Sequence, residues 1–397
     1  MAKPEIRLKG FDGEWENVSF KDISYPSGEK NRDNLSLESY SISNELGFVP
    51  QNVQFEKGGT MANADKRQYY IVTPDTFAYN PARINVGSIG YDNLNKNVIV
   101  SSLYVIFKTD SETNNEWLNI WFKTSYFKRL VELYQEGGVR LYFFYDKLCA
   151  CHCNRPSMDE QKVIANYFKS LDSMIQTTTK KIESLKQIKS ASLVSMFPQA
   201  GETTPRVRFK GFEGEWVKDK AVNLFMTFNE RNRPDLPVLS ANQDIRGMAP
   251  RSDTGYTISH NKANEVTYKV VKPGQYVIHL RSFQGGFAHS AVEGITSPAY
   301  TVFGFKNFNL HDDYFWKIIF MSKSFVKSLE AITYGIRDGR SISFSEFSEM
   351  SFFFPSKLEQ QKIATYFCSL EKQISLQEQK LEKLKQIKAA CLDKMFV

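Results

Sequence analysis

The sequence predicts an α+β protein with an internal repeat, in which two mixed domains of helices and strands are separated by two long helices that form an antiparallel coiled coil. Three observations predict this architecture. A helical segment at 156–197 recurs without a gap at 355–396. A motif of the form Arg-x-Lys-Gly-Phe-acid-Gly-Glu-Trp opens each half, at 7–15 and 208–216. The stretches between motif and helix contain β-branched and aromatic runs, which are typical of strands.

The length of 397 residues suits two domains, and the repeat is far longer than the roughly 20–50 residues of a solenoid unit. Hydrophobic residues make up 42% of the chain and aromatic residues 14%, so each half can bury a core. The predicted boundaries are a first domain at 1–154, a first long helix at 155–198, a linker at 199–206, a second domain at 207–354 and a second long helix at 355–397.

The net charge of +7 is modest and unevenly distributed. Segment 155–197 has seven basic and four acidic residues, and segment 355–397 has eight and five, so each carries +3 and the rest of the chain only +1. Mild basicity on helix surfaces is ordinary for a soluble protein. A nucleic-acid partner would therefore require a local concentration of basic side chains.

No stretch approaches the roughly 18 apolar residues of a membrane span, and the first residues do not form a secretory signal. The five cysteines are odd in number and clustered. This fits a reducing compartment better than a disulfide framework. The sequence therefore predicts a cytoplasmic protein without a membrane partner.

Both long helices carry the same start signal. Ser157 and Ser356 follow a proline, and each precedes a glutamate by three residues, at Glu160 and Glu359. In this pattern the serine oxygen accepts a hydrogen bond from the glutamate amide, and the carboxylate accepts one from the serine amide. The helices are expected to begin directly after the serines.

A narrow apolar stripe runs along each predicted helix in steps of three and four residues, which is typical of paired helices. One polar residue interrupts it in each copy. The residues predicted to form the interface are Ile164, Phe168, Leu171, Ile175, Thr178, Ile182, Leu185, Ile363, Phe367, Leu370, Ile374, Gln377, Leu381 and Leu384.

The polar interruption leaves the direction of the pair open, because Thr178 and Gln377 would meet in either orientation. Chain connectivity favours the antiparallel arrangement, which places the two domains at opposite ends of helices that rise about 60 Å over roughly 40 residues. In the alternative, each helix packs only on its own domain. A single domain rarely needs so long a helix.

Within the domains, the two halves share a skeleton but diverge in sequence. Strands are predicted in two corresponding runs, at 98–107 and 294–303. Helical stretches follow at 117–133 and 315–332, with Trp117 aligned to Trp316. A shared frame with dissimilar surfaces is expected of two domains that recognise different targets.

The cysteine run at 149–153 contains residue types that bind zinc, with His152 among them. In a strand, however, the three sulfurs would lie on one face and His152 on the other. The equivalent residues of the second half are Ser348, Met350 and Phe352, and a metal that the fold required should recur there. The run is interpreted as small core residues of a strand, and no metal site is predicted.

Motifs for catalysis are absent from the sequence. It has no phosphate-binding loop, dinucleotide-binding turn or nucleophile elbow. Segment 80–83 begins like the Asn-Pro-Pro-aromatic tetrapeptide of adenine methyltransferases but departs from it at the third residue. The histidines show no ligand spacing. The chain is therefore predicted not to be an enzyme, and no catalytic residue is proposed.

The opening motifs, the long helices and segments 79–90 and 278–287 together resemble the DNA-specificity subunit of type I restriction-modification enzymes, over essentially the whole chain. The resemblance implies two target-recognition domains, each reading half of a bipartite site in double-stranded DNA, with spacer helices between them. It also implies that two methyltransferase subunits and two restriction (endonuclease and translocase) subunits dock on this chain. Those subunits would perform adenine-N6 methylation and ATP-dependent cleavage, and S-adenosylmethionine, ATP and Mg²⁺ would bind to them rather than to this chain.

Basic and amide side chains in glycine-rich loops are the candidates for DNA contact, because arginine pairs with guanine, and asparagine or glutamine with adenine, through two hydrogen bonds. In the first domain they are Lys57, Lys66, Arg67, Asn80, Arg83, Ser88 and Arg140. In the second they are Arg246, Lys262, His279, Arg281, Gln284, Arg337 and Arg340. Arg83 and Arg281 are preferred, because each lies in a segment that carries the resemblance.

Two other interpretations stay open. A single-chain enzyme that restricts and methylates is disfavoured by the missing cofactor motifs and the short chain. An assembly scaffold within the complex, whose domains bind protein rather than DNA, would have the same repeat.

Overall fold

The structure, a computed structural model, describes residues 3–44, 46–55, 65–199, 201–242, 247–254, 262–279, 286–333 and 342–396, with the backbone alone at 253–254, 262–263 and 330–333. The chain forms two compact units. Unit 1 comprises Met1–Lys180 and Glu378–Val397, and unit 2 comprises Lys181–Gln377. Each unit therefore combines one mixed domain of helices and strands with part of each long helix, and the predicted α+β class is confirmed.

The two long helices are α6 (Met158–Ser195) and α11 (Lys357–Lys394). Both begin directly after the predicted serines, and the Ser157 hydroxyl accepts a hydrogen bond from the Glu160 amide at 3.4 Å. The capping box also predicted a hydrogen bond from the Ser157 amide to the Glu160 carboxylate. That prediction is wrong, because the carboxylate accepts from the Arg7 guanidinium instead. A guanidinium is a stronger partner for a carboxylate than a neutral amide. Among the helices of the described residues, none is both long and apolar enough to cross a membrane.

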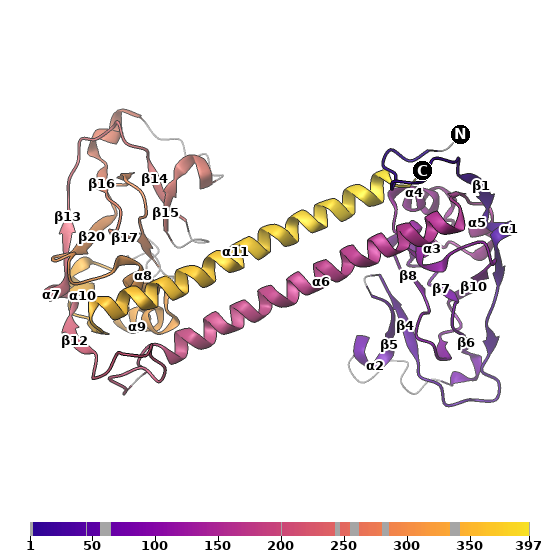
Figure 1. Ribbon diagram of the computed structural model, residues 1–397, viewed down its shortest axis with the longest axis horizontal. Helices are drawn as coiled ribbons and strands as arrows, with labels where there is room; N and C mark the ends of the chain where they lie inside the picture. The colour runs from indigo at the N-terminus through magenta and orange to yellow at the C-terminus, as the bar shows by residue number, and fades with distance from the viewer. Residues whose placement is uncertain are drawn as a thin grey trace. The chain divides into compact units, whose positions relative to one another are not determined.

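Within each unit, the two long helices run antiparallel (Figure 1). In unit 1 the first part of α6 meets the end of α11 and the residues directly after it, where the rings of Phe168 and Phe396 lie 6.0 Å apart. In unit 2 the end of α6 meets the first part of α11, with the hydroxyls of Ser192 and Tyr366 2.9 Å apart. The alternative in which each helix packs only on its own domain is therefore wrong.

Reciprocal ion pairs join the helices in both units. Asp172 pairs with Lys388 at 2.5 Å in unit 1, and Glu371 pairs with Lys189 at 2.6 Å in unit 2. The two acids occupy equivalent positions of the repeat, as do the two lysines. Each of these partly exposed ion pairs contributes little stability. Each can form in only one register of the two helices relative to one another.

The predicted interface residues divide between the units. Unit 1 holds Ile164, Phe168, Leu171, Ile175, Thr178, Leu381 and Leu384, and unit 2 holds Ile182, Leu185, Ile363, Phe367, Leu370, Ile374 and Gln377. All are buried except Ile175, Gln377 and Leu381, which are half-buried.

The domain of unit 1 consists of short elements. Its helices are α1 (Phe20–Ile23), α2 (Gln51–Gln54), α3 (Asn115–Trp121), α4 (Ser125–Tyr134) and α5 (Tyr145–Cys149), with 3-10 turns η2 (Lys66–Gln68) and η3 (Ile84–Val86). Its strands are β1 (Glu16–Ser19), β2 (Ser24–Pro26), β3 (Glu29–Lys30), β4 (Tyr40–Ser43), β5 (Gly47–Pro50), β6 (Tyr70–Val72), β7 (Phe77–Tyr79), β8 (Ile89–Tyr91), β9 (Val98–Val100), β10 (Val105–Thr109) and β11 (His152–Arg155). They pair in the orders β1-β11, β2-β10-β7-β8, β3-β6-β9 and β4-β5.

The domain of unit 2 follows a similar order of elements. Its helices are α7 (Ala221–Leu224), α8 (Asp313–Met321), α9 (Lys323–Thr333) and α10 (Phe344–Ser348), with 3-10 turns η4 (Arg251–Thr254) and η5 (Lys262–Thr267). Its strands are β12 (Val217–Lys220), β13 (Phe225–Phe228), β14 (Leu239–Asn242), β15 (Gly247–Pro250), β16 (Lys269–Val271), β17 (Tyr276–Ile278), β18 (Phe287–His289), β19 (Gly294–Thr296), β20 (Thr301–Phe305) and β21 (Ser351–Phe354). They pair in the orders β12-β21, β13-β20-β17-β18-β15-β14 and β16-β19.

Both predicted strand runs are in fact two strands. A turn closed by the Tyr104 amide on the Ser101 carbonyl separates β9 from β10, and the Tyr300 amide closes the equivalent turn on Ser297. The prediction of single strands is wrong because β9 and β10 belong to different sheets, as do β19 and β20. The chain must turn to pass from one sheet to the next.

Both predicted helical stretches are also divided in two. The Thr124 hydroxyl caps α4 by accepting a bond from the Phe127 amide, and the Ser322 hydroxyl bonds the Phe325 amide at the start of α9. Such caps satisfy amide groups that have no partner within the helix.

The alignment of Trp117 with Trp316 is wrong by one position. Asn114 and Asp312 cap α3 and α8 by accepting from the amide three residues later, which belongs to Trp117 in one unit and to Phe315 in the other. The cap fixes the register of each helix, so Trp117 corresponds to Phe315.

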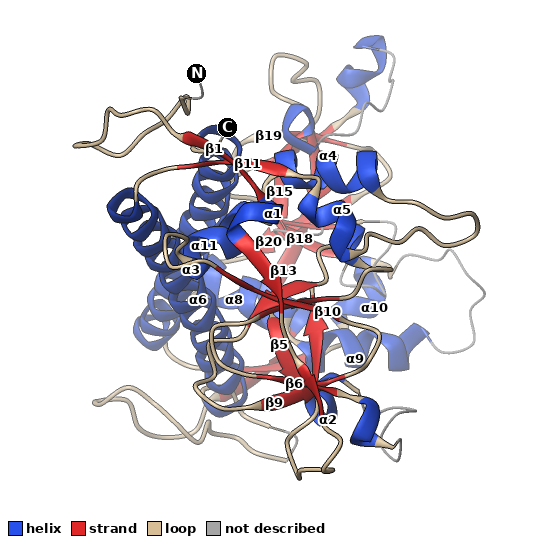
Figure 2. Cartoon of the chain, turned by 90° about the vertical axis from the view of Figure 1, so that its right-hand side faces the viewer, coloured by secondary structure: helices blue, strands red, loops and turns tan. Residues whose placement is uncertain are grey.

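The core of each unit joins its sheets to the long helices. In unit 1, Phe77 and Phe107 of the sheet share one cluster with Trp117 of α3 and Phe168 of α6. Figure 2, in which unit 1 faces the viewer, shows α3 and α6 together on one side of its strands. Unit 2 has the same arrangement, with Phe367 of α11 in its main cluster. The long helices are therefore part of each domain core.

The cysteine run is not one strand. Cys149 ends α5, and β11 begins at His152. Cys151 and Cys153 lie in the core of unit 1, where burial raises the pKa of both thiols to about 12. They are therefore protonated thiols near neutral pH, which are poor metal ligands. Within the described ranges, no group of three or more His, Cys, Asp and Glu side chains could hold a metal ion.

An aromatic cage in unit 2 surrounds His311. Its ring lies 4.8 Å from that of Phe305 and 5.2 Å from that of Phe354, and 7% of the residue is exposed. Burial, with a smaller effect of Lys357, lowers the pKa of His311 to about 4. The fold therefore holds a neutral imidazole.

Unit 2 is expected to lose stability on mild acidification through His311. The folded-state pKa lies below the unfolded value of about 6.5, so this contribution is complete above that pH and is lost as the pH falls toward 4. We expect a loss of about 2 kcal/mol in the free energy of unfolding between pH 7.5 and 5. Hydrogen exchange in α8, compared between the wild type and His311→Phe, measures it. The same acid sensitivity in the variant would contradict this assignment.

Candidate nucleic-acid interface

The opening motif of each half binds the start of the long helix of the same half. Arg7 donates two hydrogen bonds of 2.7 Å to the Glu160 carboxylate, and Arg208 bonds Glu359 in the same way at 2.9 and 2.7 Å. Both glutamates are almost fully buried. The hydrogen bond to Glu160 raises the pKa of Arg7. In each unit, the opening motif and the start of the long helix therefore bind each other, although they lie far apart in the sequence.

A glutamine makes a second repeated junction between domain and helix. Gln161 accepts from the Asn114 amide at 2.7 Å and donates to the Glu112 and Pro156 carbonyls. Gln360 makes the same three contacts in unit 2, with the Asp312 amide and with the carbonyls of Leu310 and Pro355. Each domain is thus attached to its helix by the same polar contacts.

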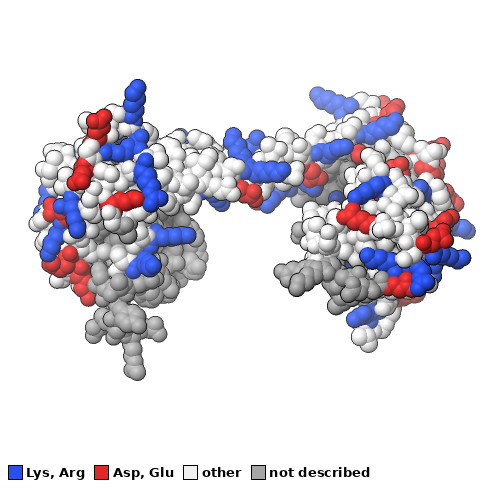
Figure 3. Space-filling model, turned by 90° about the horizontal axis from the view of Figure 1, so that it is seen from below, with Lys and Arg blue, Asp and Glu red and all other residues white. Residues whose placement is uncertain are grey.

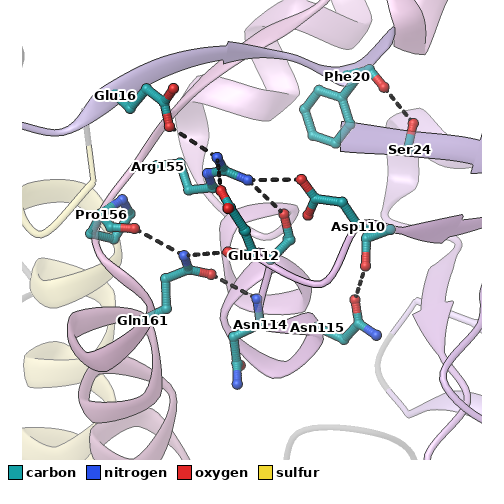
Figure 4. Close-up of polar contacts among 12 residues, drawn as sticks. Glu16, Phe20, Ser24, Asp110, Glu112, Asn114, Asn115, Arg155, Pro156 and Gln161 are labelled. Carbon is teal, nitrogen blue, oxygen red and sulfur yellow. Dashed lines mark hydrogen bonds and ion pairs between the residues drawn. The ribbon is translucent and has the colours of Figure 1, made fainter. Parts of the chain in front are cut away.

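A polar cluster unique to unit 1 lies beside this junction (Figure 4). The Arg155 guanidinium, 8% exposed, donates to Glu16, Asp110 and Glu112 at 2.9 to 3.1 Å. Three carboxylates around one buried cation leave this surface with an excess of negative charge. It is therefore unsuited to a DNA phosphate backbone.

Three loops of unit 1 gather where candidate DNA-binding residues lie. Residues 80–88 connect β7 to β8, and the Asn80 amide closes this loop on the Ser88 carbonyl at 3.1 Å. The Phe143 amide donates to the Pro81 carbonyl at 3.0 Å, which brings residues 136–142 alongside. The β4–β5 hairpin packs on β8 so closely that a Cβ at Gly90 would lie 3.1 Å from the Gly47 Cα. These three segments are the loop cluster of unit 1.

Arg83 and Arg140 are exposed on the loop cluster. Neither guanidinium has a hydrogen-bonding or ion-pair partner within the described part of the chain. They are therefore available to a ligand, and the backbone that carries them is held by hydrogen bonds to neighbouring loops.

Two other candidates on this loop have structural roles. Ser88 is buried, and its hydroxyl donates to the Ile42 carbonyl at 2.9 Å, so the prediction that it contacts DNA is not supported. The Asn80 side-chain oxygen accepts from the Ala82 amide at 3.0 Å, which orders the turn. The sequence indicates that both are polar residues of a loop, but only the fold shows the hydrogen-bond partners of their side chains.

Comparison with known proteins identifies part of the chain directly. Residues 217–386 match the family described as the type I restriction modification DNA specificity domain. These residues belong to that family. No curated protein matches the chain significantly. The resemblance noted from the sequence is thereby confirmed for the specificity domain of unit 2, and the repeated junctions relate unit 1 to it.

Solved structures share the fold of the specificity domains. The S subunit of a type I restriction-modification system from M. genitalium is 13% identical, with a TM-score of 0.59 over 100% of this chain and 99% of that one. The HsdS subunit from Thermoanaerobacter tengcongensis is 13% identical, with a TM-score of 0.50 over 96% of each chain. At this identity the likeness establishes the fold alone.

Most candidates of the second specificity domain lie outside the described residues. These are Arg246, Arg281, Gln284, Arg337 and Arg340, together with Lys57 of the first domain, and the side chain of Lys262 is likewise not described. His279 is buried at the end of β17, with its ring 6.1 Å from that of Tyr300. In the sequence, residues 279–286 lie between β17 and β18 as residues 80–88 lie between β7 and β8. The preferred residues Arg83 and Arg281 therefore belong to corresponding connections.

The remaining candidates of unit 1 lie just before β6, a strand of the three-stranded sheet. Lys66 and Arg67 form η2 directly before β6, and Arg67 is paired with Asp65 at 3.0 Å. Two basic residues that sequence reasoning missed are Lys128 and Arg129, exposed on α4, which packs against η3 of the loop cluster. Nothing in a single sequence marks them, because only the fold brings α4 beside this loop.

Charge does not identify a binding face by itself. Figure 3 shows basic and acidic side chains interspersed on the visible face of the domain of each unit. This agrees with the nearly neutral total outside the long helices. A DNA contact would therefore depend on a few placed arginines more than on a broad basic surface.

Proposed function

We propose that this chain is the DNA-specificity subunit of a type I restriction-modification complex, in which each unit reads half of a bipartite site in double-stranded DNA. The observation that carries the proposal is the specificity-domain match over 217–386, together with identical helix junctions in both units. The chain supplies recognition and no chemistry. Methyltransferase and restriction subunits bind S-adenosylmethionine, ATP and Mg²⁺ and carry out adenine-N6 methylation and cleavage.

The loop cluster is the proposed DNA contact of unit 1. Base readout requires side chains that reach base edges from a backbone that phosphate contacts hold in place. Arg83 and Arg140 are exposed on fixed loops, and a guanidinium can form two hydrogen bonds with guanine or bind a phosphate. Residues 280–285 and 334–341 of unit 2, which contain Arg281 and Arg337, hold the corresponding places in the sequence.

The repeated helices are the proposed docking surface for two identical methyltransferase subunits. Ile188 and Ile387 occupy equivalent positions in the repeated segments 186–189 and 385–388, and they are 47% and 37% exposed. Two copies of one partner need the same side chains at both places. Each of the two places has an exposed isoleucine within the same four-residue sequence, so both can bind the same partner.

A double substitution in the loop cluster tests the DNA contact. We expect Arg83→Ala with Arg140→Ala to weaken DNA binding by the assembled methyltransferase about 100-fold, since each lost base or phosphate contact costs about 1–3 kcal/mol. Fluorescence anisotropy with a duplex that contains the methylated motif measures the affinity. Lys21→Ala, at an exposed position of α1, is the matched control and should stay within about twofold. Unchanged affinity in the double variant would overturn the assignment.

A domain exchange separates DNA recognition from a scaffold role. Residues 20–150 are replaced by the corresponding segment of a homologous chain, and modified adenines are mapped across the genome. Recognition by unit 1 predicts that one half of the methylated motif changes and the other is retained. An active complex with an unchanged motif would favour the scaffold.

A further inference from the structure

One surface differs in chemical character between the two units. The repeat shows which positions of the two units correspond there. Strand pairing places Glu16 opposite Arg155 in unit 1 and Val217 opposite Phe354 in unit 2. The repeated glutamine junction places Leu310 where unit 1 has Glu112. The ionic cluster of unit 1 is therefore replaced by apolar side chains in unit 2.

Four exposed apolar side chains of unit 2 lie at or beside these positions. Val217, Phe308, Leu310 and Leu358 are 59%, 47%, 59% and 70% exposed, and we call them the apolar patch. Leu358 corresponds to Asp159 in the repeat. Arg155 bonds Glu16 and Glu112 simultaneously in unit 1, so the equivalent positions are neighbours. The Lys357 Nζ donates to the Phe308 carbonyl at 2.9 Å, which brings the start of α11 to the same place.

Two lysines border the apolar patch, and one of them stands where unit 1 has an acid. The Asp110 amide donates to the Ile23 carbonyl, and the Lys306 amide makes the equivalent bond to Leu224, so Lys306 replaces Asp110. Lys306 is exposed, and Lys357 adds a second ammonium group beside Phe308. The surface thus changes from net acidic in unit 1 to apolar with a basic border in unit 2.

The fold does not require this patch, because unit 1 builds the same junction with Glu16, Glu112 and Asp159 at the corresponding positions. A partner that bound both units in the same way does not explain the patch either, because such a partner needs the same side chains in both units. Contiguous exposed apolar side chains bordered by charge are characteristic of protein contacts. The patch therefore has a role that unit 1 does not share.

We propose that the apolar patch binds, once per chain, an amphipathic segment of a partner protein whose apolar side chains are flanked by carboxylates. The carboxylates would pair with Lys306 and Lys357 while the apolar side chains cover Leu310 and Leu358. A second copy of this chain fits less well. Two such patches would oppose lysine to lysine, and the acidic surface of unit 1 offers no apolar side chains to cover the patch. The proposal does not depend on DNA recognition.

Two synthetic peptides serve as probes for the full-length chain. Both carry leucines along one helical face, flanked by glutamates in one peptide and by lysines in the other, and fluorescence anisotropy measures binding. We expect the glutamate peptide to bind at least tenfold more tightly than the lysine peptide. Leu310→Glu with Leu358→Asp, which installs the residues of unit 1, should weaken its binding at least tenfold. Lys306→Asp should also weaken it.

Controls separate the possible outcomes. Leu376→Thr also installs the residue of unit 1 at an exposed leucine on α11, and it should leave binding unchanged. Thermal unfolding checks that the double variant is folded, and Val217→Glu is a second variant if it is not. Absence of saturable binding, equal binding of both peptides or full binding by the folded variants would overturn the proposal. Sedimentation that shows self-association abolished by the double variant would assign the patch to a second copy instead.

Discussion

Replacing Phe168 with alanine is expected to lower the free energy of unfolding of unit 1 by about 4 kcal/mol. The side chain is 1% exposed and lies in the unit 1 core, against Phe396 and beside Trp117 in the same cluster. Alanine would leave a cavity between α6 and the end of α11 that closely packed neighbours cannot fill. Hydrogen exchange followed by mass spectrometry measures the loss of amide protection in each unit separately.

Phe367→Ala is the matched variant in unit 2. Phe367 corresponds to Phe168 in the repeat. It is fully buried, and the centre of its ring lies 6.1 Å from that of Phe197. The same loss is expected, confined to the amides of unit 2. Ile188→Ala, at an exposed position of α6, should change stability by less than about 1 kcal/mol. If either phenylalanine variant lowered protection equally in both units, separate cores for the two units would be ruled out.

Glu160→Ala is expected to destabilise unit 1 by about 3 kcal/mol. The substitution removes one partner of a buried ion pair and leaves Arg7 without its carboxylate, a change that costs more than the net stabilisation from the intact pair. It also removes the acceptor of the Trp15 indole, whose Nε1 lies 3.2 Å from Glu160. Denaturant unfolding of the full chain, with hydrogen exchange at the start of α6, measures the effect.

Glu359→Ala provides the comparison in unit 2. It breaks the same bonds to Arg208, but the Trp216 Nε1 has no hydrogen-bond partner among the described residues. The loss should therefore be smaller than for Glu160→Ala by about 1 kcal/mol, the contribution of one hydrogen bond. An equal or larger loss in Glu359→Ala would show that the Trp15 bond adds nothing.

The repeat made the helical part of the architecture predictable. Ser157 and Ser356 marked helix starts that the structure reproduces, because an N-cap depends on residues within one turn. The spacing of Phe168 and Phe367 within an apolar stripe marked side chains that are buried. These features are local or periodic, so a single sequence contains them.

The strands and helices of the domains were less predictable. The runs 98–107 and 294–303 have uniform strand composition, and composition does not show that a chain leaves one sheet for another. The match of Trp117 to Trp316 failed because a cap, not a similar side chain, sets the helix register. In the candidate site, Arg83 and Ser88 are both polar loop residues, and only their neighbours separate an exposed guanidinium from a buried hydroxyl.

The sequence by itself determined that this protein is a duplicated α+β chain with two long paired helices, because the repeat, the helix caps and the apolar periodicity can be read from residue types and their spacing. Only the tertiary structure decided that the opening motif holds the helix start through Arg7 and Glu160, that Arg83 and Arg140 share one cluster of loops, and that an ionic junction in unit 1 becomes an apolar patch in unit 2. Those outcomes depend on contacts between residues far apart in the chain. The energy of such contacts comes from burial and geometry that no single position reveals.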